Sequence, residues 1–344
     1  MTARKIRFLF HMLKIKAFGM KPFPLYVNLV INRSCNLKCL YCFGEYYNRR
    51  EKEYSLEEIK GIIDEIHAMG TRYILIQGGE PFLRKDLGEI IDYIDHKGII
   101  PAVITNGTLT RRIKEIPPLK KLDNICFSLD GFQEGNDQQR GNGVFDRVIG
   151  SIEEVRRHFP KLKVRMNVVL TRFTVGAFPE FLDFCGQKKI DVQVGSLFKN
   201  HPIAAAPEEV KRMAAFLVQR KKEGMRIVAS ADTLRYVRDW PFKNDIWVNR
   251  ERATALLGRK AKECQYGNYE AIIDSNGDVY PCNALQGDPS FHPKNLKEVG
   301  IREAFNHLRT KKCYTCNIAS MIDTSEIINW NLRTILGRSI MELK

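Results

Sequence analysis

Residues 35–42 read Cys35-Asn-Leu-Lys-Cys39-Leu-Tyr-Cys42 and follow directly after an apolar, β-branched stretch at 25–31. Three thiols this close cannot complete a structural zinc site, which takes four ligands. They can hold three irons of a [4Fe–4S] cluster, because soft thiolates favour such clusters, and the fourth iron then stays open to a small molecule. A zinc site completed by a distant His or Cys remains the alternative.

Outward from this motif, short β-branched or aromatic runs alternate with amphipathic helical patterns. We expect strands at 25–31, 73–77, 101–105, 124–128, 163–170 and 191–195. We expect helices between them at 55–69, 86–96 and 143–158. Six strand–helix units indicate a parallel sheet with right-handed crossovers but are too few for a closed eight-stranded barrel. The predicted fold class is therefore α/β, a partial (β/α)6 TIM-like barrel with its active site in the loops that follow the strands.

Polar and glycine-containing motifs follow several of these strands. Gly-Gly-Glu-Pro at 78–81 follows the second strand, where glycines let a ligand approach the backbone and a carboxylate can bind an ammonium group. Thr-Asn-Gly at 105–107 ends the third strand and Ser-Leu-Asp-Gly at 128–131 ends the fourth. Arg140 opens a later Arg-Gly-Asn-Gly-Val-Phe-Asp stretch. The motifs at 78–81 and 105–107 could each, taken alone, be an ordinary turn.

The cysteine spacing and the order of the motifs resemble the radical S-adenosylmethionine (SAM) superfamily over about residues 24–200. Its signature is the same C-x3-C-x2-C with an aromatic residue before the last cysteine. The resemblance implies that Cys35, Cys39 and Cys42 hold the catalytic cluster. It also implies SAM contacts from Tyr41, Gly78, Gly79, Glu80, Ser128, Asp130, Arg140 and Leu197.

Some of these contacts carry a specific expected role. By resemblance, Glu80 would bind the ammonium group of SAM, Ser128 its ribose and Arg140 its carboxylate. Leu197 would pack near the adenine, an ordinary core leucine being the alternative. Residues 105–107 would help to form the pocket.

A second group of cysteines comprises Cys264, Cys282, Cys313 and Cys316. Four thiols suit either a fully ligated [4Fe–4S] cluster or zinc. A β-hairpin turning at Asn276-Gly277 is expected to bring the first two together. The spacing from Cys264 to Cys282 resembles the opening of a SPASM domain, and the absence of cysteines after Cys316 resembles its truncated twitch form. That resemblance implies a second, auxiliary [4Fe–4S] cluster.

One departure from a related family is informative. In relatives that mature sulfatases anaerobically, an aspartate that acts as catalytic base follows the cysteine equivalent to Cys282. Here Asn283 stands in that place, and an amide cannot accept the proton. Sulfatase maturation is therefore not expected.

The charge and composition set the class of protein. The net charge of +15 and 44% hydrophobic residues describe a basic, globular chain. No run of about 18 apolar residues lacks a charge, and the start of the chain lacks the pattern of a secretory signal. We therefore expect a cytoplasmic protein whose clustered cysteines bind metal, while Cys126 and Cys185 are buried.

The predicted organisation has five parts. They are a basic amphipathic segment at 1–23, the barrel at 24–225, a connector at 226–263, the SPASM/twitch-like iron–sulfur domain at 264–322 and an amphipathic terminal helix at 323–344. Both ends could lie on an anionic membrane surface, or could pack across the open side of the barrel with their charges solvated.

The resemblance implies an enzyme, a radical SAM oxidoreductase or transferase. It would cleave SAM reductively to methionine and a 5′-deoxyadenosyl radical, which abstracts hydrogen from a peptide, small-molecule or lipid substrate. A reductase such as flavodoxin or ferredoxin would supply the electron, and no nucleic-acid partner is expected. The alternative is a zinc-stabilised, basic nucleic-acid-binding protein without redox chemistry.

Overall fold

The computed structural model describes residues 21–46, 53–197, 201–242 and 245–335. By its internal contacts the chain divides into two compact units. The first unit comprises the described parts of Met1–Phe127, Asp146–Val164 and Tyr266–Lys311. The second unit comprises those of Ser128–Phe145, Arg165–Gln265 and Lys312–Lys344. The chain thus passes repeatedly from one unit to the other.

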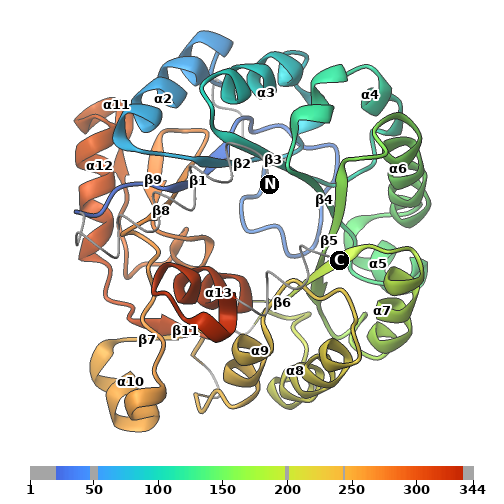
Figure 1. Cartoon of the computed structure of the whole chain (residues 1–344), viewed down its shortest axis with the longest axis vertical. Helices are drawn as coiled ribbons and strands as arrows, with labels where there is room; N and C mark the ends of the chain where they lie inside the picture. Colours follow the sequence, from blue (N-terminus) through green and yellow to red (C-terminus); the bar gives the residue numbers. More distant parts are fainter. Residues whose placement is uncertain (1–20, 47–52, 198–200, 243–244, 336–344) are drawn as a thin grey trace. The chain divides into compact units, whose positions relative to one another are not determined.

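The first unit is built on strands in the order β10-β9-β8-β1-β2-β3-β4 (Figure 1). Their bounds are β1 Tyr26–Val30, β2 Tyr73–Gln77, β3 Ile100–Thr105, β4 Asn124–Ser128, β8 Glu270–Ile273, β9 Asp278–Tyr280 and β10 Lys294–Asn295. Strand β1 pairs in parallel with both β2 and β8, whereas β9 runs antiparallel to β8 and β10. The sheet of this unit is therefore mostly parallel, and its antiparallel edge comes from late in the sequence.

Helices of the first unit lie on the outer side of these strands (Figure 1). They are α2 Leu56–Met69, α3 Leu87–His96, α4 Thr110–Lys114, α6 Val144–His158, α11 Leu296–Val299 and α12 Ile301–His307. Short 3-10 turns lie at Pro81–Leu83, Pro117–Lys121, Asn283–Leu285 and Leu308–Thr310. Helix α2 begins at Ser55, which forms a capping box with Glu58, and ends at Gly70, whose φ of +117° suits glycine.

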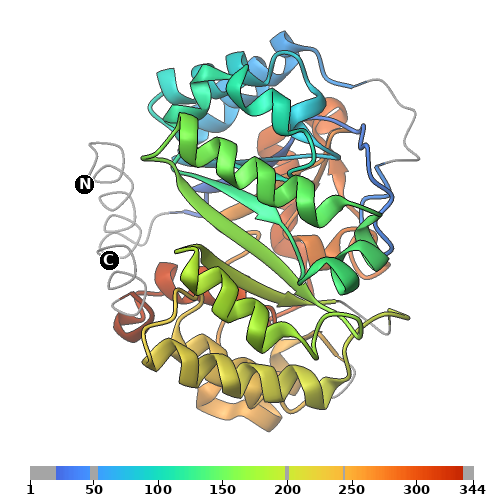
Figure 2. The same ribbon diagram turned by 90° about the vertical axis from the view of Figure 1, so that its right-hand side faces the viewer.

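The second unit contains two strand pairs and most of the remaining helices (Figures 1 and 2). Strand β5 (Lys163–Leu170) pairs in parallel with β6 (Asp191–Ser196), and β7 (Trp247–Val248) pairs antiparallel with β11 (Thr315–Cys316). The helices are α5 Gln133–Arg140, α7 Phe178–Gln187, α8 Pro207–Lys222, α9 Ala231–Arg238, α10 Arg250–Leu257 and α13 Ala319–Ile328, with a 3-10 turn at Gly258–Lys260. Strand β6 contacts α7 and α13, and α9 contacts α8 and α13.

Most predicted elements are confirmed. Strands β2, β4 and β5 have the predicted bounds, and β1, β3 and β6 differ by one residue at one or both ends. The hairpin of β8 and β9 turns at Gly277, whose φ is +98°. Both Cys126 and Cys185 are buried. No helix in the described part of the chain is long and apolar enough to cross a membrane.

The terminal helix differs from the prediction. Helix α13 begins at Ala319, before the predicted start, and ends at Ile328. The chain turns at Trp330, whose φ is +60°, and the backbone N–H of Asn331 donates to the Glu326 carbonyl at 2.8 Å. This turn interrupts the helical pattern that the apolar spacing indicated. Residues 336–344, like most of the basic segment at 1–23, lie outside the described residues, and the five predicted domain boundaries stay predictions.

Candidate active site

The cysteine loop, residues 35–42, follows β1 in the first unit. Its three thiols are half-buried, and the backbone N–H of Cys42 donates to the Cys39 carbonyl at 3.1 Å. Burial raises the pKa of the Cys35 thiol to about 11 against a hydrogen bond from the Leu37 N–H, and the negative charges of Glu80, Cys39 and Cys42 add to the rise. The negative charges of Cys39 and Cys42 therefore act on the Cys35 thiol. A cation that binds Cys35 must displace its proton.

The glycines of residues 78–81 lie against the chain that leads into the cysteine loop. The N–H of Gly79 donates to the Asn32 carbonyl at 3.1 Å, and the N–H of Glu80 to the Ser34 carbonyl at 2.8 Å. A Cβ on Gly78 would lie 2.0 Å from Asn32 Oδ1, and one on Gly79 would lie 2.2 Å from the Ser34 carbonyl oxygen. Position 79 therefore requires glycine because it touches the backbone of Ser34, and position 78 requires it because the Asn32 side chain lies against it.

Glu80 is fully buried and links two of the strand-end loops. Its Oε1 accepts from the Thr105 hydroxyl at 2.7 Å and from the Phe82 N–H at 3.0 Å, and its Oε2 accepts from the Asn106 N–H at 2.7 Å. Burial raises the pKa of this carboxyl to about 7, although all three hydrogen bonds lower it. The side chain thus fixes the loops after β2 and β3, and its expected contact with the SAM ammonium stays a prediction.

A chain of amides beside Cys35 was not predicted in detail. The Nδ2 of Asn106 lies 3.9 Å from Cys35 Sγ and donates to Asn36 Oδ1 at 2.9 Å, while Asn36 Nδ2 donates to the Thr108 hydroxyl at 2.8 Å. The sequence predicts residues 105–107 near the pocket but does not single out Asn36 or Thr108. Asn36 lies within the cysteine motif and Thr108 follows a predicted strand end, and these positions could have indicated a role for both residues. An N–H aimed at a ligating sulfur tunes the cluster that the sulfur holds.

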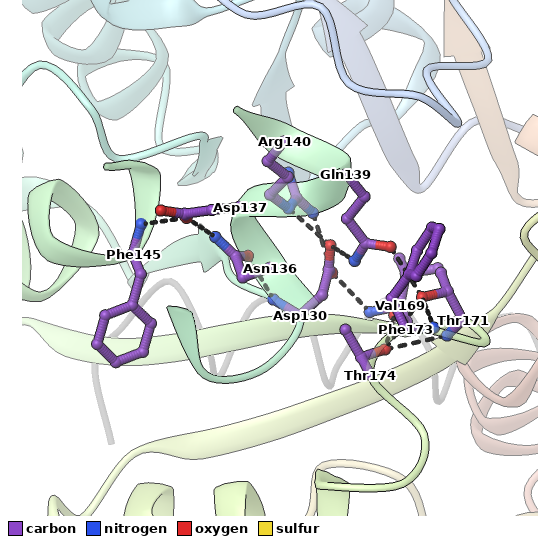
Figure 3. Close-up of polar contacts among 10 residues, drawn as sticks. All are labelled: Asp130, Asn136, Asp137, Gln139, Arg140, Phe145, Val169, Thr171, Phe173 and Thr174. Carbon is purple, nitrogen blue, oxygen red and sulfur yellow. Dashed lines mark hydrogen bonds and ion pairs between the residues drawn. The ribbon is translucent and has the colours of Figure 1, made fainter. Parts of the chain in front are cut away.

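In the second unit the structure brings Asp130 and Arg140 together (Figure 3). The Nε of Arg140 donates to Asp130 Oδ2 at 2.7 Å and its Nη2 donates to Oδ1 at 3.1 Å. The same carboxylate accepts from Gln139 Nε2 at 2.6 Å and from the Val169 N–H at 2.9 Å. Both residues were expected to contact SAM, and the structure adds that they form a buried ion pair with each other.

The other expected SAM contacts are placed as follows. Ser128 ends β4 and Leu197 follows β6, both half-buried in the second unit. Tyr41 is half-buried on the cysteine loop of the first unit. The contacts of these three residues with SAM stay predictions.

Three of the four cysteines in the second group belong to the second unit. Cys264 and Cys316 are buried and Cys313 is half-buried. The Cys264 N–H donates to the carbonyl of Tyr314 at 2.9 Å, so the segment with Cys264 runs beside the one with Cys313 and Cys316. Cys282 is buried in the first unit just after β9, and its role as fourth ligand stays a prediction.

A half-buried ion triad, formed by Lys262, Asp232 and Glu326, holds the segment that carries Cys264. The ammonium of Lys262 lies 2.7 Å from the Asp232 carboxylate on α9 and 2.5 Å from the Glu326 carboxylate on α13. Burial alone would lower the pKa of Lys262, but its hydrogen bonds with the two carboxylates outweigh burial and raise it. The Gln265 N–H donates to the Ser325 hydroxyl at 2.9 Å, so both sides of Cys264 are anchored.

The residues of the cysteine loop fit a [4Fe–4S] cluster. The three thiols of the loop are soft ligands, and the charges of Cys39 and Cys42 act on Cys35, as neighbouring ligands of one cluster would. Among the described residues, the cysteine loop included, no three His, Cys, Asp or Glu side chains are already arranged around a single metal ion.

Comparison with known proteins matches residues 29–185 to the model of the Radical SAM superfamily. A mycofactocin maturase, MftC, of Mycolicibacterium smegmatis is 27% identical over 83% of this chain and 70% of its own length. An Fe-coproporphyrin III synthase of Methanosarcina barkeri is 34% identical over 46% of this chain. The chain spans only 40% of that synthase.

Two solved structures show the fold. Streptococcus suis SuiB bound to its precursor peptide SuiA has a TM-score of 0.62 at 21% identity, covering 87% of this chain and 69% of SuiB. The enzyme anSMEcpe with AdoMet and a peptide has a TM-score of 0.62 at 15% identity, covering 92% of this chain and 99% of that one. The predicted α/β partial-barrel fold is confirmed by these likenesses.

The comparisons support the first interpretation and not the alternative of a zinc-stabilised nucleic-acid-binding protein. A probable GTP 3′,8-cyclase of Methanococcus maripaludis is 31% identical over 56% of this chain and 68% of its own length. Since residues 29–185 also match the family model, the chain belongs to the radical SAM superfamily, whose enzymes use a [4Fe–4S] cluster and SAM.

Proposed function

We propose that the chain cleaves SAM reductively and uses the resulting 5′-deoxyadenosyl radical to abstract hydrogen from a substrate. The observation that carries this proposal is the joining of the cysteine loop to residues 78–81 by backbone hydrogen bonds at positions where only glycine fits. That arrangement fixes the loop that carries the three thiols against the end of the second strand, where a radical SAM active site is expected.

The protein's part in this reaction is to bind, orient and protect. When bound, the cluster supplies one electron to the sulfonium of SAM. Cys35, Cys39 and Cys42 hold it, and Glu80 fixes the loops after β2 and β3 beside it. Arg140, oriented by Asp130, offers a cation for the SAM carboxylate. We assign the ribose contact to Ser128 and the adenine contact to Leu197.

The second cysteine group would hold an auxiliary [4Fe–4S] cluster through Cys264, Cys282, Cys313 and Cys316. Four ligands leave no open iron, so this cluster would support the structure or carry electrons. Anchoring of Cys264 by the ion triad supports a fixed site. A reductase such as flavodoxin or ferredoxin would supply the electron, in the cytoplasm, where thiols stay reduced. Contact of residues 1–23 with a membrane surface remains a further expectation.

For the substrate, a peptide is the first candidate. A relative that covers 83% of this chain is a maturase, and the structures of SuiB and anSMEcpe each hold a peptide. A molecule of the iron-porphyrin class is the second candidate, because the synthase from Methanosarcina barkeri is named for making Fe-coproporphyrin III and is 34% identical over 46% of this chain.

The test begins with anaerobically reconstituted protein. Two complete cubes correspond to about eight irons per chain. Dithionite and SAM should release 5′-deoxyadenosine, and the triple variant Cys35→Ala, Cys39→Ala, Cys42→Ala should release none. The matched control is Cys126→Ala, a buried cysteine outside both groups, which should keep both iron and activity. A triple variant that still cleaves SAM would overturn the proposal.

A deuterated substrate then separates the candidates. Peptides encoded beside this gene and Fe-coproporphyrin III are each supplied in deuterated form. Transfer of deuterium into 5′-deoxyadenosine identifies the substrate from which hydrogen is abstracted.

A further inference from the structure

The carboxylate of Asp130 is saturated by donors from its own unit (Figure 3). It is 0% exposed and accepts four hydrogen bonds, two from Arg140, one from Gln139 and one from the Val169 N–H. The two bonds from Arg140 engage its Nε and Nη2, so they fix the plane of the guanidinium. Asp130 therefore orients Arg140.

Gln139 connects this ion pair to the end of β5. Its Nε2 donates to Asp130 Oδ2 at 2.6 Å, while its Oε1 accepts from the Thr171 hydroxyl at 2.8 Å. Gln139 is 1% exposed and Thr171 is 0% exposed, so water cannot replace either partner. Both polar ends of the Gln139 amide thus have a partner, and the amide has a single orientation.

Thr171 is itself held in place. Its N–H donates to the Thr174 hydroxyl at 3.1 Å, and it forms an isolated bridge with Ala204. The chain of contacts from Thr171 through Gln139 and Asp130 to Arg140 therefore begins on a fixed turn.

The short helix α5 needs this support. Its N-cap residue, Phe132, makes no side-chain cap, and α5 has only eight residues. Contacts near its ends come from side chains: Asn136 Oδ1 accepts the Asp130 N–H at 3.1 Å, and Asp137 accepts the Gly143 N–H at 2.7 Å. A helix this short is marginal without tertiary contacts, so the direction of Arg140 at its last position depends on them.

We infer that Gln139 and Thr171 are positioning residues for the carboxylate of SAM, acting through Asp130 on Arg140. The inference rests on the proposed function, in which Arg140 binds the carboxylate of SAM. Without the Gln139 amide, Asp130 Oδ2 keeps one donor from Arg140, and the Thr171 hydroxyl loses its link to the ion pair. The buried ion pair then loses its fixed geometry, and binding of a carboxylate weakens.

The test compares two ligands with reconstituted protein. S-adenosylhomocysteine carries the amino-acid carboxylate, whereas 5′-methylthioadenosine lacks it. Gln139→Met should raise the Kd of the first ligand by about tenfold, the loss expected for a hydrogen bond to a charged group, and leave that of the second unchanged. The control Asn124→Leu removes a buried amide that donates to Asp123 at 3.1 Å in the other unit, and should change neither Kd.

A second pair of variants keeps the inference open to refutation where Gln139→Met fails to fold. Thr171→Val removes the hydroxyl with little change in shape and should weaken S-adenosylhomocysteine selectively, by about threefold, whereas Thr171→Ser keeps the hydroxyl and should bind as the unaltered protein does. Equal weakening of both ligands, or of neither, would overturn the inference. If the unaltered protein binds no SAM, the proposed function itself fails.

Discussion

The two cysteine groups are held in opposite ways. The first occupies eight consecutive residues of one loop, with all three thiols half-buried. In the second unit, Cys264 and Cys316 are only 6% and 5% exposed, and they come from segments joined by backbone pairing and flanked by the ion triad. The difference teaches that two groups of the same side chain can be held differently, the first by one half-buried loop and the second by separate, buried segments; the proposed roles, an open catalytic cluster and an enclosed auxiliary one, match this difference.

The largest effect should come from the backbone contact behind the accessible loop. Gly79→Ala places a Cβ 2.2 Å from the Ser34 carbonyl, so the two backbones must separate. We expect loss of about four irons and of nearly all 5′-deoxyadenosine. The control Gly61→Ala, in α2 with nothing within 4 Å, should keep both and gain stability of up to about 1 kcal/mol. The iron content and the amount of 5′-deoxyadenosine are measured for both variants. A normal iron content in Gly79→Ala would contradict the role of this backbone contact.

Removing thiols from the anchored set should have a different signature. The double variant Cys264→Ala, Cys316→Ala should lose about four irons but still release 5′-deoxyadenosine from SAM without substrate, since the first cluster is separate. Iron content and product are measured together. Complete loss of SAM cleavage in this variant would show that the two groups are not independent.

The ion triad beside Cys264 should contribute measurably to the stability of the segment that holds the second cysteine group. Lys262→Met leaves the buried Glu326 carboxylate and the half-buried Asp232 carboxylate without their shared cation, and should lower the free energy of unfolding by about 2 kcal/mol. The control Lys60→Met breaks an exposed helix-surface pair with Glu57 and should leave the denaturant midpoint close to that of the unaltered protein. Denaturant melts of the two variants give both values, and similar midpoints would refute the role of the triad.

The smallest effect concerns the amide beside Cys35. Asn106→Leu removes the side-chain N–H that lies 3.9 Å from Cys35 Sγ. A hydrogen bond to a ligating sulfur stabilises the more negative, reduced state of a cluster, so its loss favours the oxidised state. We expect the reduction potential of the first cluster to fall by about 20 mV, the lower end for one hydrogen bond in a one-electron couple. A titration followed by electron paramagnetic resonance measures it, and a potential that stays or rises would contradict the assignment.

Features that depend on residues close together in the sequence could be predicted from it. The strand bounds, the helix predicted at 55–69 and the turn at Gly277 each depend on neighbouring residues, and the structure confirms them to within one or two residues. The break at Trp330 escaped because Ile328, Leu332 and Ile335 keep a helical spacing across it. A pattern of apolar residues does not reveal that one residue between them has a positive φ.

Long-range polar pairing was the part that sequence could not supply. Asp130 and Arg140 each suit a SAM contact by chemistry, so nothing in the sequence showed that they bind each other. Lys262 is 30 residues from Asp232 and 64 from Glu326, and only the folded chain brings the three together. Such partners depend on tertiary packing, which spacing alone does not encode.

The parallel pairing of β8 with β1 has a consequence for cutting this protein into pieces. A truncation just before Cys264 would remove β8, β9 and β10 from the first unit and leave β1 with an unpaired flank. Exposed edges of this kind recruit other chains, so the shortened protein should aggregate instead of surviving as a smaller enzyme. The segment after Cys264 thus contributes strands to the same sheet as β1, the strand that leads into the first cysteine loop. It is therefore not a separate domain that can be removed.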